Sequence, residues 1–328
     1  MTKYTHISLW KEKDAAGLHG GGVEVFAGYL QRAIPELELL SLPDHPEWEG
    51  LYQDMLSADP DSHLRDWQVA EIYCDWLARE NVVDENTVVI CDGFWGRGLQ
   101  GKVARCISVV HGTYWGRWLR SIQSPWGETV PMDFVDAQLD MWNDERTEIV
   151  CCSKQCVYEL QWAGVDYTRA RVIAHGVDTE AYRPYGEPRI FMHAATDARK
   201  GCDIVNVVQH FEGCPPFEFM DEHSGVPENK ARRLSEAIAL VAPTRHEGNA
   251  YVLLEAMACG VPLITYATGL AANEMDARCG VILDDLAPVN ILRTMLEFNR
   301  QLYSPREWVL ENATFERFAE EWKEFLHA

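Results

Sequence analysis

The sequence lacks the features that mark a membrane-spanning or polyanion-binding protein. It has no continuous apolar run of the ~18 residues that a membrane-spanning helix needs, and it shows no N-terminal signal peptide. Basic residues are few, since 29 Lys and Arg stand against 51 Asp and Glu, which gives a net charge of −22. This excess of acid argues against nucleic acid as the main partner and favours a solvated acidic exterior. We therefore expect a cytoplasmic protein with no transmembrane segment.

The patterns that define a metal or dinucleotide site are also missing. Cys151, Cys152 and Cys156 have no second half at ligand spacing, and Asp284-Asp285 lacks the spacing of a D-x-D metal site. No glycine-rich turn fits the G-x-G-x-x-G dinucleotide fingerprint. We expect no metal and no bound cofactor, and we interpret the ten cysteines as buried free thiols in a reducing compartment.

The sequence does contain enough apolar material for two domains. At 328 residues, 47% of them hydrophobic, the chain can bury two cores without covalent cross-links. Short apolar runs that alternate with helical spacing predict two doubly wound α/β domains, each with a parallel sheet. Pro184, Gly186 and Pro188 indicate a linker, so we expect an N-terminal domain over 1–184 and a C-terminal domain over 185–310.

The expected elements can be given by range. Strands are expected at 4–10, 37–42, 87–91, 105–110, 147–153, 217–220, 238–241, 261–264 and 280–283. Helices are expected at 64–78, 131–145, 154–162, 227–238, 253–258, 290–302 and 311–326, with another through Phe26 and Leu30. Residues 45–61 are expected to form a loop, because Pro43, Pro46 and Pro60 lie in or just before this segment. The aromatic-rich segment 114–126 is expected to be a loop in an acceptor region, its tryptophans facing a ligand or packing beneath the loop.

One stretch, 241–265, organises the second half of the chain. A short apolar strand is followed by a loop that contains Gly248 and by a helix that Gly260 ends before a further buried strand. The helix therefore begins at the carboxyl end of a strand, which is the edge where ligands bind in an open α/β sheet. Amides at a helix start attract phosphate, so this stretch predicts an anion-binding site.

Two carboxylates flank that helix start. Glu247 lies in the loop, and at ~1.5 Å rise per residue Glu255 lies roughly 7–8 Å beyond Ala250 along the helix. A nucleotide sugar is laid out on a comparable scale, with a ribose, a diphosphate and a sugar. We expect Glu255 to bind ribose hydroxyls, the amides of Asn249, Ala250 and Tyr251 to face phosphate, and Glu247 to contact the sugar. The alternative is a solvent-facing glutamate and a salt-bridged glutamate with no ligand.

The setting of this pair resembles a known family. The E-x7-E spacing within HEGNAYVLLEAMACGVPLI resembles the signature of the family-4 retaining glycosyltransferases of the GT-B fold. The resemblance covers nearly the whole chain and implies two domains that face a central cleft. It also implies metal-independent transfer of a sugar from a nucleotide-diphosphate sugar, with retention of anomeric configuration. The acceptor implied is a hydroxyl on a small molecule, a glycan or a lipid-linked molecule.

The first half of the chain carries softer elements of the same resemblance. The sequence Gly21-Gly22-Val23-Glu24 is similar to the family's first loop, which faces the transferred sugar and the leaving phosphate. His111 follows a buried strand and corresponds to a histidine near the donor sugar, although a hydrogen-bonded histidine at a core edge is the simpler interpretation. The resemblance also implies that the C-terminal helix within 311–328 packs back on the N-terminal domain.

A third element concerns the diphosphate. Lys200, beside a glycine at the start of a helix, resembles the family's R-x-x-x-x-K-G site, where cations stabilise the departing diphosphate. Ala195 stands where the family has arginine, so Arg199 or His193 is a candidate replacement. We therefore assign catalytic roles to Lys200, His111 and Glu247, and a phosphate oxygen of the leaving group takes the acceptor proton.

Three alternatives stay open. The first is another GT-B enzyme, such as a nucleotide-sugar epimerase or a phosphorylase. The second is a glycosyltransferase that modifies nucleic-acid bases, which the net charge disfavours. The third is a non-catalytic relative that only binds nucleotide sugars, for which the missing arginine at Ala195 is the best support.

Overall fold

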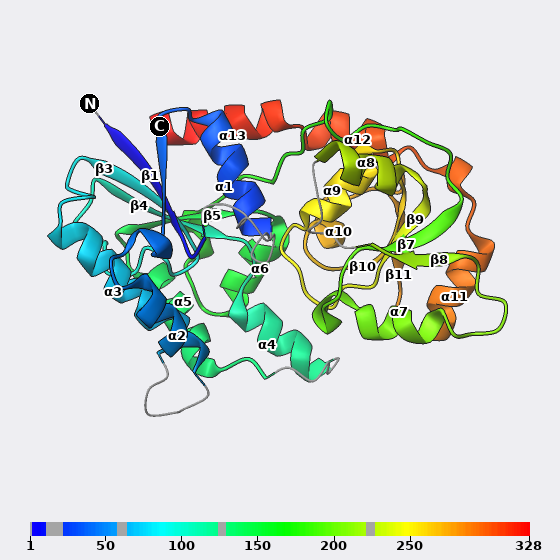
Figure 1. Ribbon diagram of the computed structural model, residues 1–328, viewed down its shortest axis with the longest axis horizontal. Coiled ribbons are helices and arrows are strands. Elements are labelled where there is room, and N and C mark those ends of the chain that lie inside the picture. Colours follow the sequence, from blue (N-terminus) through cyan, green and yellow to red (C-terminus); the bar gives the residue numbers. More distant parts are fainter. Residues whose placement is uncertain (1, 11–21, 58–63, 124–128, 221–226) are drawn as a thin grey trace. The chain divides into compact units, whose positions relative to one another are not determined.

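The computed structural model describes residues 2–10, 22–57, 64–123, 129–220 and 227–328 (Figure 1). These residues form two compact units. The first consists of Met1–Trp115, Val130–Cys152 and Cys156–Ile173, and the second of Gly116–Thr129, Ser153–Gln155 and Ala174–Ala328. The domain boundary expected near Pro184, and the packing expected for the C-terminal helix, stay predictions.

The first unit is built on a six-stranded parallel sheet in the order β2-β1-β3-β4-β5-β6. Its strands are β1 Lys3–Ser8, β2 Leu37–Ser41, β3 Thr87–Asp92, β4 Arg105–Val110, β5 Thr147–Cys151 and β6 Ala170–Val172. Its helices are α1 Gly22–Ala33, α2 Trp48–Leu56, α3 Asp66–Arg79, α5 Met132–Asn143 and α6 Lys154–Trp162, the last of which shares two residues with the second unit. Every residue of β3 is buried, as expected for a strand covered on both faces.

Packing on the first sheet divides its helices between the two faces. Tyr73 of α3 and Trp142 of α5 belong to one large cluster with Val89 of β3, whereas Phe26 and Leu30 of α1 are buried outside that cluster. Trp142 donates its indole N–H to Ser108 Oγ at 2.9 Å, and Ser108 Oγ donates to the carbonyl of Gly93 at 2.6 Å. This buried chain of hydrogen bonds fixes the turn that follows β3.

The second unit is built on a five-stranded parallel sheet in the order β11-β10-β9-β7-β8. Its strands are β7 Ile190–His193, β8 Phe217–Phe219, β9 Ala237–Ala242, β10 Leu263–Tyr266 and β11 Gly280–Leu283. Its helices are α7 Cys202–Val208, α8 Pro227–Ser235, α9 Tyr251–Ala258, α10 Leu270–Asn273, α11 Pro288–Glu297, α12 Pro305–Asn312 and α13 Phe315–His327. Helices α7 and α11 share one apolar cluster, whereas α8, α9 and α12 share another, so both faces of the sheet are covered (Figure 1).

The two parallel sheets confirm the expected fold class, but two expected loops are wrong. Residues 45–61 contain α2, because Trp48, Leu51, Tyr52 and Met55 recur at helical spacing and pack on the first core while the prolines lie outside the helix. Residues 114–126 contain α4 Tyr114–Gln123, the helix at the division between the units. In both segments local helical periodicity outweighs the composition that suggests a loop.

Two further expected helices have other bounds than predicted. The helix expected over 290–302 is α11, which ends at Glu297 and is followed by a 3-10 turn at Arg300–Leu302. The single helix expected over 311–326 is two helices, α12 and α13, because Thr314 caps α13 by accepting a hydrogen bond from the Arg317 N–H.

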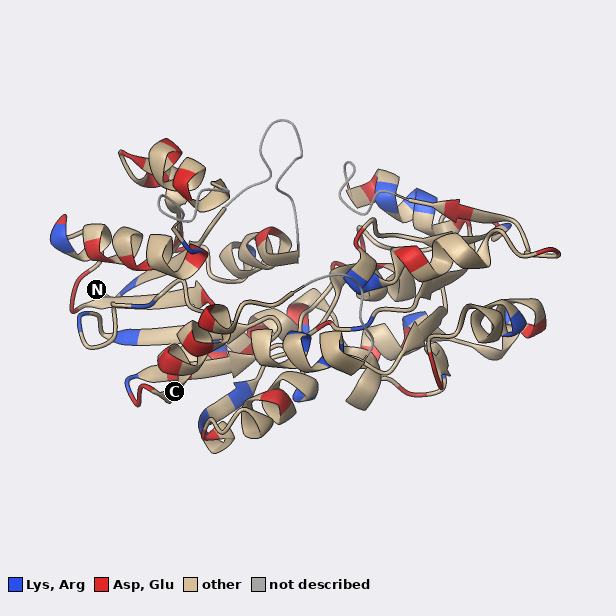
Figure 2. Ribbon diagram, turned by 90° about the horizontal axis from the view of Figure 1, so that it is seen from below, with Lys and Arg blue, Asp and Glu red and all other residues tan. Residues whose placement is uncertain are grey.

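Charge and sulfur are distributed as the sequence suggests. Acidic residues occur along helices of both units, with Lys and Arg interspersed (Figure 2). All ten cysteines are free thiols, and eight of them are buried. Within the described ranges, no helix combines the length and apolar character needed to cross a membrane.

Candidate active site

The most buried helix of the second unit opens the site. All eight residues of α9 are buried, which explains its nearly continuous apolar sequence. The residue before the helix is Ala250, which has no side-chain oxygen to cap the first amides. The start of α9 therefore keeps amide donors and the positive end of the helix dipole near the carboxyl end of β9, as predicted.

A pocket beside this helix start gathers several of the predicted residues. It lies at the ends of β7 and β9 and is lined by His193, Ala194, Ala195, Lys200, Leu240, Ala242, Thr244, Glu247, Ala250, Val252 and Leu253. Lys200 and Glu247, which are far apart in the sequence, thus lie at one pocket within the second unit. Ala195, the position where the resembled family has arginine, lines the same pocket.

Glu247 is paired with Arg199. Glu247 Oε2 lies 3.4 Å from Arg199 Nη1, which also donates to the carbonyl of His246 at 3.0 Å. Asp197 binds the other end of the guanidinium, with Oδ2 at 3.1 Å from Nη2. The side chains of Arg199 and Glu247 are each 19% exposed, so the pair is largely shielded from solvent. Arg199 therefore orients the Glu247 carboxylate. The sequence suggested a different role for Arg199, as a cation that binds the diphosphate.

Arg245 joins the two loops of the site, and sequence reasoning missed it. Its side chain is 6% exposed and makes a two-pronged contact with Asp203, at 2.7 Å to Oδ1 and 2.8 Å to Oδ2. It also donates to the carbonyl of Ala198, and its backbone N–H donates to the carbonyl of Arg199 at 2.9 Å. Burial would raise the pKa of Asp203, but the hydrogen bonds and charge of Arg245 outweigh it and lower that pKa.

A glycine lets these loops approach each other. Gly201 has φ of +88°, in the left-handed region, and a Cβ built there would lie 2.5 Å from the carbonyl oxygen of Pro243. Only glycine fits this position without a shift of the backbone. The contact explains why glycine follows Lys200 and holds that lysine beside the β9–α9 loop.

Glu255, the expected ribose ligand, has a partner that sequence reasoning also missed. Glu255 Oε2 lies 2.7 Å from Nζ of Lys230, which comes from α8. The Glu255 side chain is 2% exposed and that of Lys230 is 12% exposed, so this is a buried ion pair. No local sequence signal links the two residues, because the pair forms only when α8 and α9 pack together.

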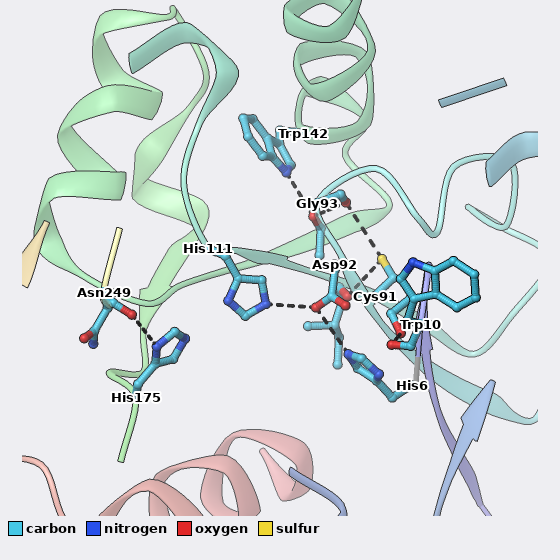
Figure 3. Close-up of polar contacts among 12 residues, drawn as sticks. His6, Trp10, Cys91, Asp92, Gly93, His111, Trp142, His175 and Asn249 are labelled. Atoms are coloured by element: carbon cyan, nitrogen blue, oxygen red, sulfur yellow. Dashed lines mark hydrogen bonds and ion pairs between the residues drawn. The ribbon is translucent and has the colours of Figure 1, made fainter. Parts of the chain in front are cut away.

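Residues around the α9 start are held by His175. Its Nδ1 lies 2.8 Å from the carbonyl oxygen of Asn249 (Figure 3). Its ring stacks on Tyr251 with centroids 4.4 Å apart. His175, Asn249 and Tyr251 are all nearly buried. His175 takes the place of an asparagine in the resembled segment, and here it fixes the backbone just before α9.

In the first unit, His111 belongs to a cluster centred on Asp92. Asp92 Oδ1 lies 2.8 Å from Nε2 of His111 and 3.3 Å from Nε2 of His6 (Figure 3). The side chains of Asp92, His111 and His6 are 8%, 17% and 0% exposed. Burial would raise the pKa of Asp92, but the charge of His6 and hydrogen bonds from both histidines outweigh it and lower that pKa to about 2.

The two glycines predicted to face the donor lie at the start of the first helix or just before it. Gly22 is the exposed first residue of α1, and Gly21 lies outside the described residues. Among the residues that the structure describes, no group of three or more His, Cys, Asp or Glu side chains could hold a metal ion.

Comparison with known proteins places the chain in a structural class. Residues 206–298 match the family model described as glycosyl transferases group 1. Sucrose-phosphate synthase from Thermosynechococcus elongatus aligns with a TM-score of 0.77 at 14% identity, covering 100% of this chain and 98% of that one. Anabaena HepE in complex with UDP and glucose aligns with a TM-score of 0.67 at 11% identity, covering 100% of both chains. No curated protein gives a significant match in sequence.

A third solved structure also aligns with nearly the whole chain. WaaG, described as a glycosyltransferase involved in lipopolysaccharide biosynthesis, aligns with a TM-score of 0.62 at 15% identity, covering 97% of this chain and 98% of that one. The two parallel sheets match the GT-B fold of these structures, and residues 206–298 are similar to glycosyl transferases group 1. The matched segment runs from α7 to the end of α11, and so includes the whole stretch 241–265 that the sequence singled out.

Proposed function

We propose that this protein transfers a sugar from a nucleotide-diphosphate sugar to a hydroxyl acceptor, with retention of anomeric configuration and without a metal ion. The observation that carries the proposal is the pocket where Lys200, Glu247 and the start of α9 meet. A cation and a helix N-terminus at one pocket suit a diphosphate, which gains negative charge as the glycosidic bond breaks.

We assign a role to each side chain of the candidate site. Lys200 neutralises the departing diphosphate, and the amides at Ala250 and Tyr251 bind its oxygens. Glu247, oriented by Arg199, accepts hydrogen bonds from the transferred sugar. Glu255, oriented by Lys230, binds the ribose. We assign His111, which directly follows β4 in the first unit, to the transferred sugar, as the resemblance implies, and a phosphate oxygen takes the acceptor proton.

The donor class is narrowed by the structural relatives. HepE is described in complex with UDP-glucose, and TarM in complex with UDP. Uridine-diphosphate sugars are therefore the first donors to test for this chain. The acceptor is a hydroxyl of a small molecule, a glycan or a lipid-linked molecule, and the ten free thiols fit a reaction in the cytoplasm.

The first experiment measures donor binding by thermal stabilisation with UDP-, GDP- and ADP-sugars, with and without EDTA. A donor at 100 times its dissociation constant adds roughly 2.7 kcal/mol of stability, which is readily detected. Release of nucleotide diphosphate from the stabilising donor then reports turnover, and NMR of the sugar product reports its anomeric configuration. An inverted product would refute retention, and loss of turnover in EDTA would refute metal independence.

The second experiment tests the assigned residues with matched controls. Glu247→Gln should abolish most turnover, whereas Glu297→Gln on the exposed side of α11 should not change it. Lys200→Ala should also abolish most turnover. Its control is Lys323→Ala on α13, which should leave turnover unchanged. Normal turnover in both Glu247→Gln and Lys200→Ala would refute the site.

One observation favours a second candidate, a protein that binds nucleotide sugars without transferring them. Ala195 occupies the position where the resembled family has a cationic side chain, and Arg199 is engaged by Glu247 and Asp197. Of the residues that line the pocket, Lys200 is then the cationic side chain that binds the diphosphate. Stabilisation by a donor sugar without any release of nucleotide diphosphate, across a panel of sugar acceptors, would establish this candidate.

A further inference from the structure

We propose that Asp92 is a positioning residue for His111. It accepts a hydrogen bond from Nε2 of His111 and so holds the ring in the tautomer with the proton on Nε2. This inference rests on the proposed function, in which His111 faces the donor sugar. It adds a residue of β3 and a residue of β1 to the site of the first unit.

The cluster is assembled from three neighbouring strands. The sheet order places β1 beside β3 and β3 beside β4, so the chain segments that carry His6, Asp92 and His111 are adjacent. Asp92 is the last residue of β3, and His111 directly follows β4. The carboxylate therefore lies between the two imidazole rings (Figure 3).

The chemistry of a carboxylate fixes the proton. An ionised carboxylate can only accept hydrogen bonds, so each imidazole nitrogen that contacts it must carry a hydrogen. Both histidines approach Asp92 Oδ1 through Nε2, at 2.8 Å for His111 and 3.3 Å for His6. The pKa of Asp92 is lowered to about 2, so the carboxylate is ionised at neutral pH and the requirement holds there.

Packing keeps the rings in place. Phe26 of α1 meets the His111 ring edge-on, with centroids 4.7 Å apart, and lies 5.8 Å from the His6 ring. A flip of the His111 ring would replace the Nε2–H contact with Asp92 by a carbon–hydrogen contact. The carboxylate and the phenyl ring together therefore fix both the tautomer and the orientation of His111.

The role of His6 follows from the same geometry. Its ring is fully buried and approaches the oxygen that also binds His111, at a longer distance. His6 supports the negative charge of Asp92 from the side away from solvent. Its removal should weaken the fixation of His111 less than removal of the carboxylate, because the carboxylate itself accepts the Nε2 proton.

The spectroscopic test reads the tautomer directly. Long-range ¹H–¹⁵N correlation spectra of the histidine rings, with His111 assigned by its absence in His111→Gln, should show the Nε2–H pattern for His111 in the wild-type protein. In Asp92→Asn the pattern should move toward a mixture, because an amide can donate as well as accept. Asp75→Asn, an exposed change on α3, is the matched control and should leave the pattern unchanged. An Nδ1–H pattern in the wild-type protein would overturn the proposal, whether or not any variant folds.

The kinetic test uses release of nucleotide diphosphate from the donor identified by thermal stabilisation. Asp92→Asn should lower kcat roughly 10- to 100-fold, by analogy with the loss on removing a residue that orients a metal-ligating histidine, with little change in KM. A kcat and an ¹⁵N pattern equal to those of the wild type would overturn the positioning role while leaving sugar transfer intact. If the wild-type protein turns over no donor, sugar transfer fails, and the ¹⁵N pattern alone then decides the role of Asp92.

Discussion

The two polar regions of this protein are built in different ways. In the second unit, Lys200, Arg199, Arg245 and Glu247 come from two short loops that meet at one pocket. In the first unit, a single buried carboxylate, Asp92, joins side chains from two other strands. The exposed fractions differ as well, since the Glu247 and Arg199 side chains are each 19% exposed, whereas those of Asp92 and His6 are 8% and 0% exposed. We therefore expect changes in the loop site to affect donor chemistry and changes at buried carboxylates to affect stability as well.

The largest expected effect is on turnover at the loop site. Lys200→Ala should lower kcat about 10²- to 10³-fold, because one group that stabilises developing charge is lost. The free energy of unfolding without donor should change by less than about 0.5 kcal/mol, as for other surface substitutions. Donor turnover and urea unfolding measure the two quantities. A large loss of stability with unchanged turnover would show that Lys200 serves the fold and not donor chemistry.

The second prediction concerns the buried pair under the loop site. Lys230→Met should lower the free energy of unfolding at pH 7 by roughly 3 kcal/mol, because it leaves the Glu255 carboxylate buried without its partner. The double variant with Glu255→Gln should recover much of that loss. Urea unfolding of the wild type and of the two variants decides the matter, and a Lys230→Met protein as stable as the wild type would show that the pair contributes nothing to the fold.

The third prediction concerns pH and the strand cluster. The pKa of Asp92 in the folded protein is about 2, below its ordinary value of 3.8, so its stabilisation is complete above that ordinary value. It is then lost as the pH falls toward 2, and the full effect is about 2 kcal/mol. The difference in unfolding free energy between the wild type and Asp92→Asn should therefore shrink between pH 5 and pH 2, within the ~pH 5 to pH 1 range where such carboxylates are titrated. A constant difference would mean that the ionised form of Asp92 is not favoured by folding.

The smallest expected effect is at Arg199. Arg199→Lys keeps the charge but loses the fixed fork that binds the His246 carbonyl, Glu247 and Asp197. We expect donor affinity to weaken by about 1 kcal/mol, the net value of a typical hydrogen bond, with little change in kcat. Isothermal titration with the stabilising donor measures it. A larger effect on kcat than on affinity would assign Arg199 to the departing diphosphate itself.

Much of the fold could be predicted from the sequence. Buried parallel strands are continuous apolar runs, so β3, β4 and β11 were located within a residue. Helix α2 was missed because the flanking prolines suggest a loop, although Trp48 and Met55 hold its apolar face. The loop site was predictable because its residues lie in one continuous stretch, 241–265, next to Lys200 in space.

The strand cluster and the buried pair could not be predicted in the same way. Nothing in the sequence near His6 or Asp92 shows that they approach one another, because that contact depends on β1 and β3 being neighbours. Lys230 and Glu255 meet only through the packing of α8 on α9. Contacts of this kind depend on sheet order and helix packing, which local periodicity does not encode.

The junction between Gly201 and Pro243, reinforced by the contact of Arg245 with Asp203, has a consequence for protein engineering. The segment that presents Lys200 and the segment that presents Glu247 share an interface with no room for an added methyl group. A donor preference transplanted from another enzyme should therefore be transferable only if both segments are exchanged together. A graft of either segment alone would meet a mismatched surface and should yield a protein that is less soluble, whatever its new side chains could bind.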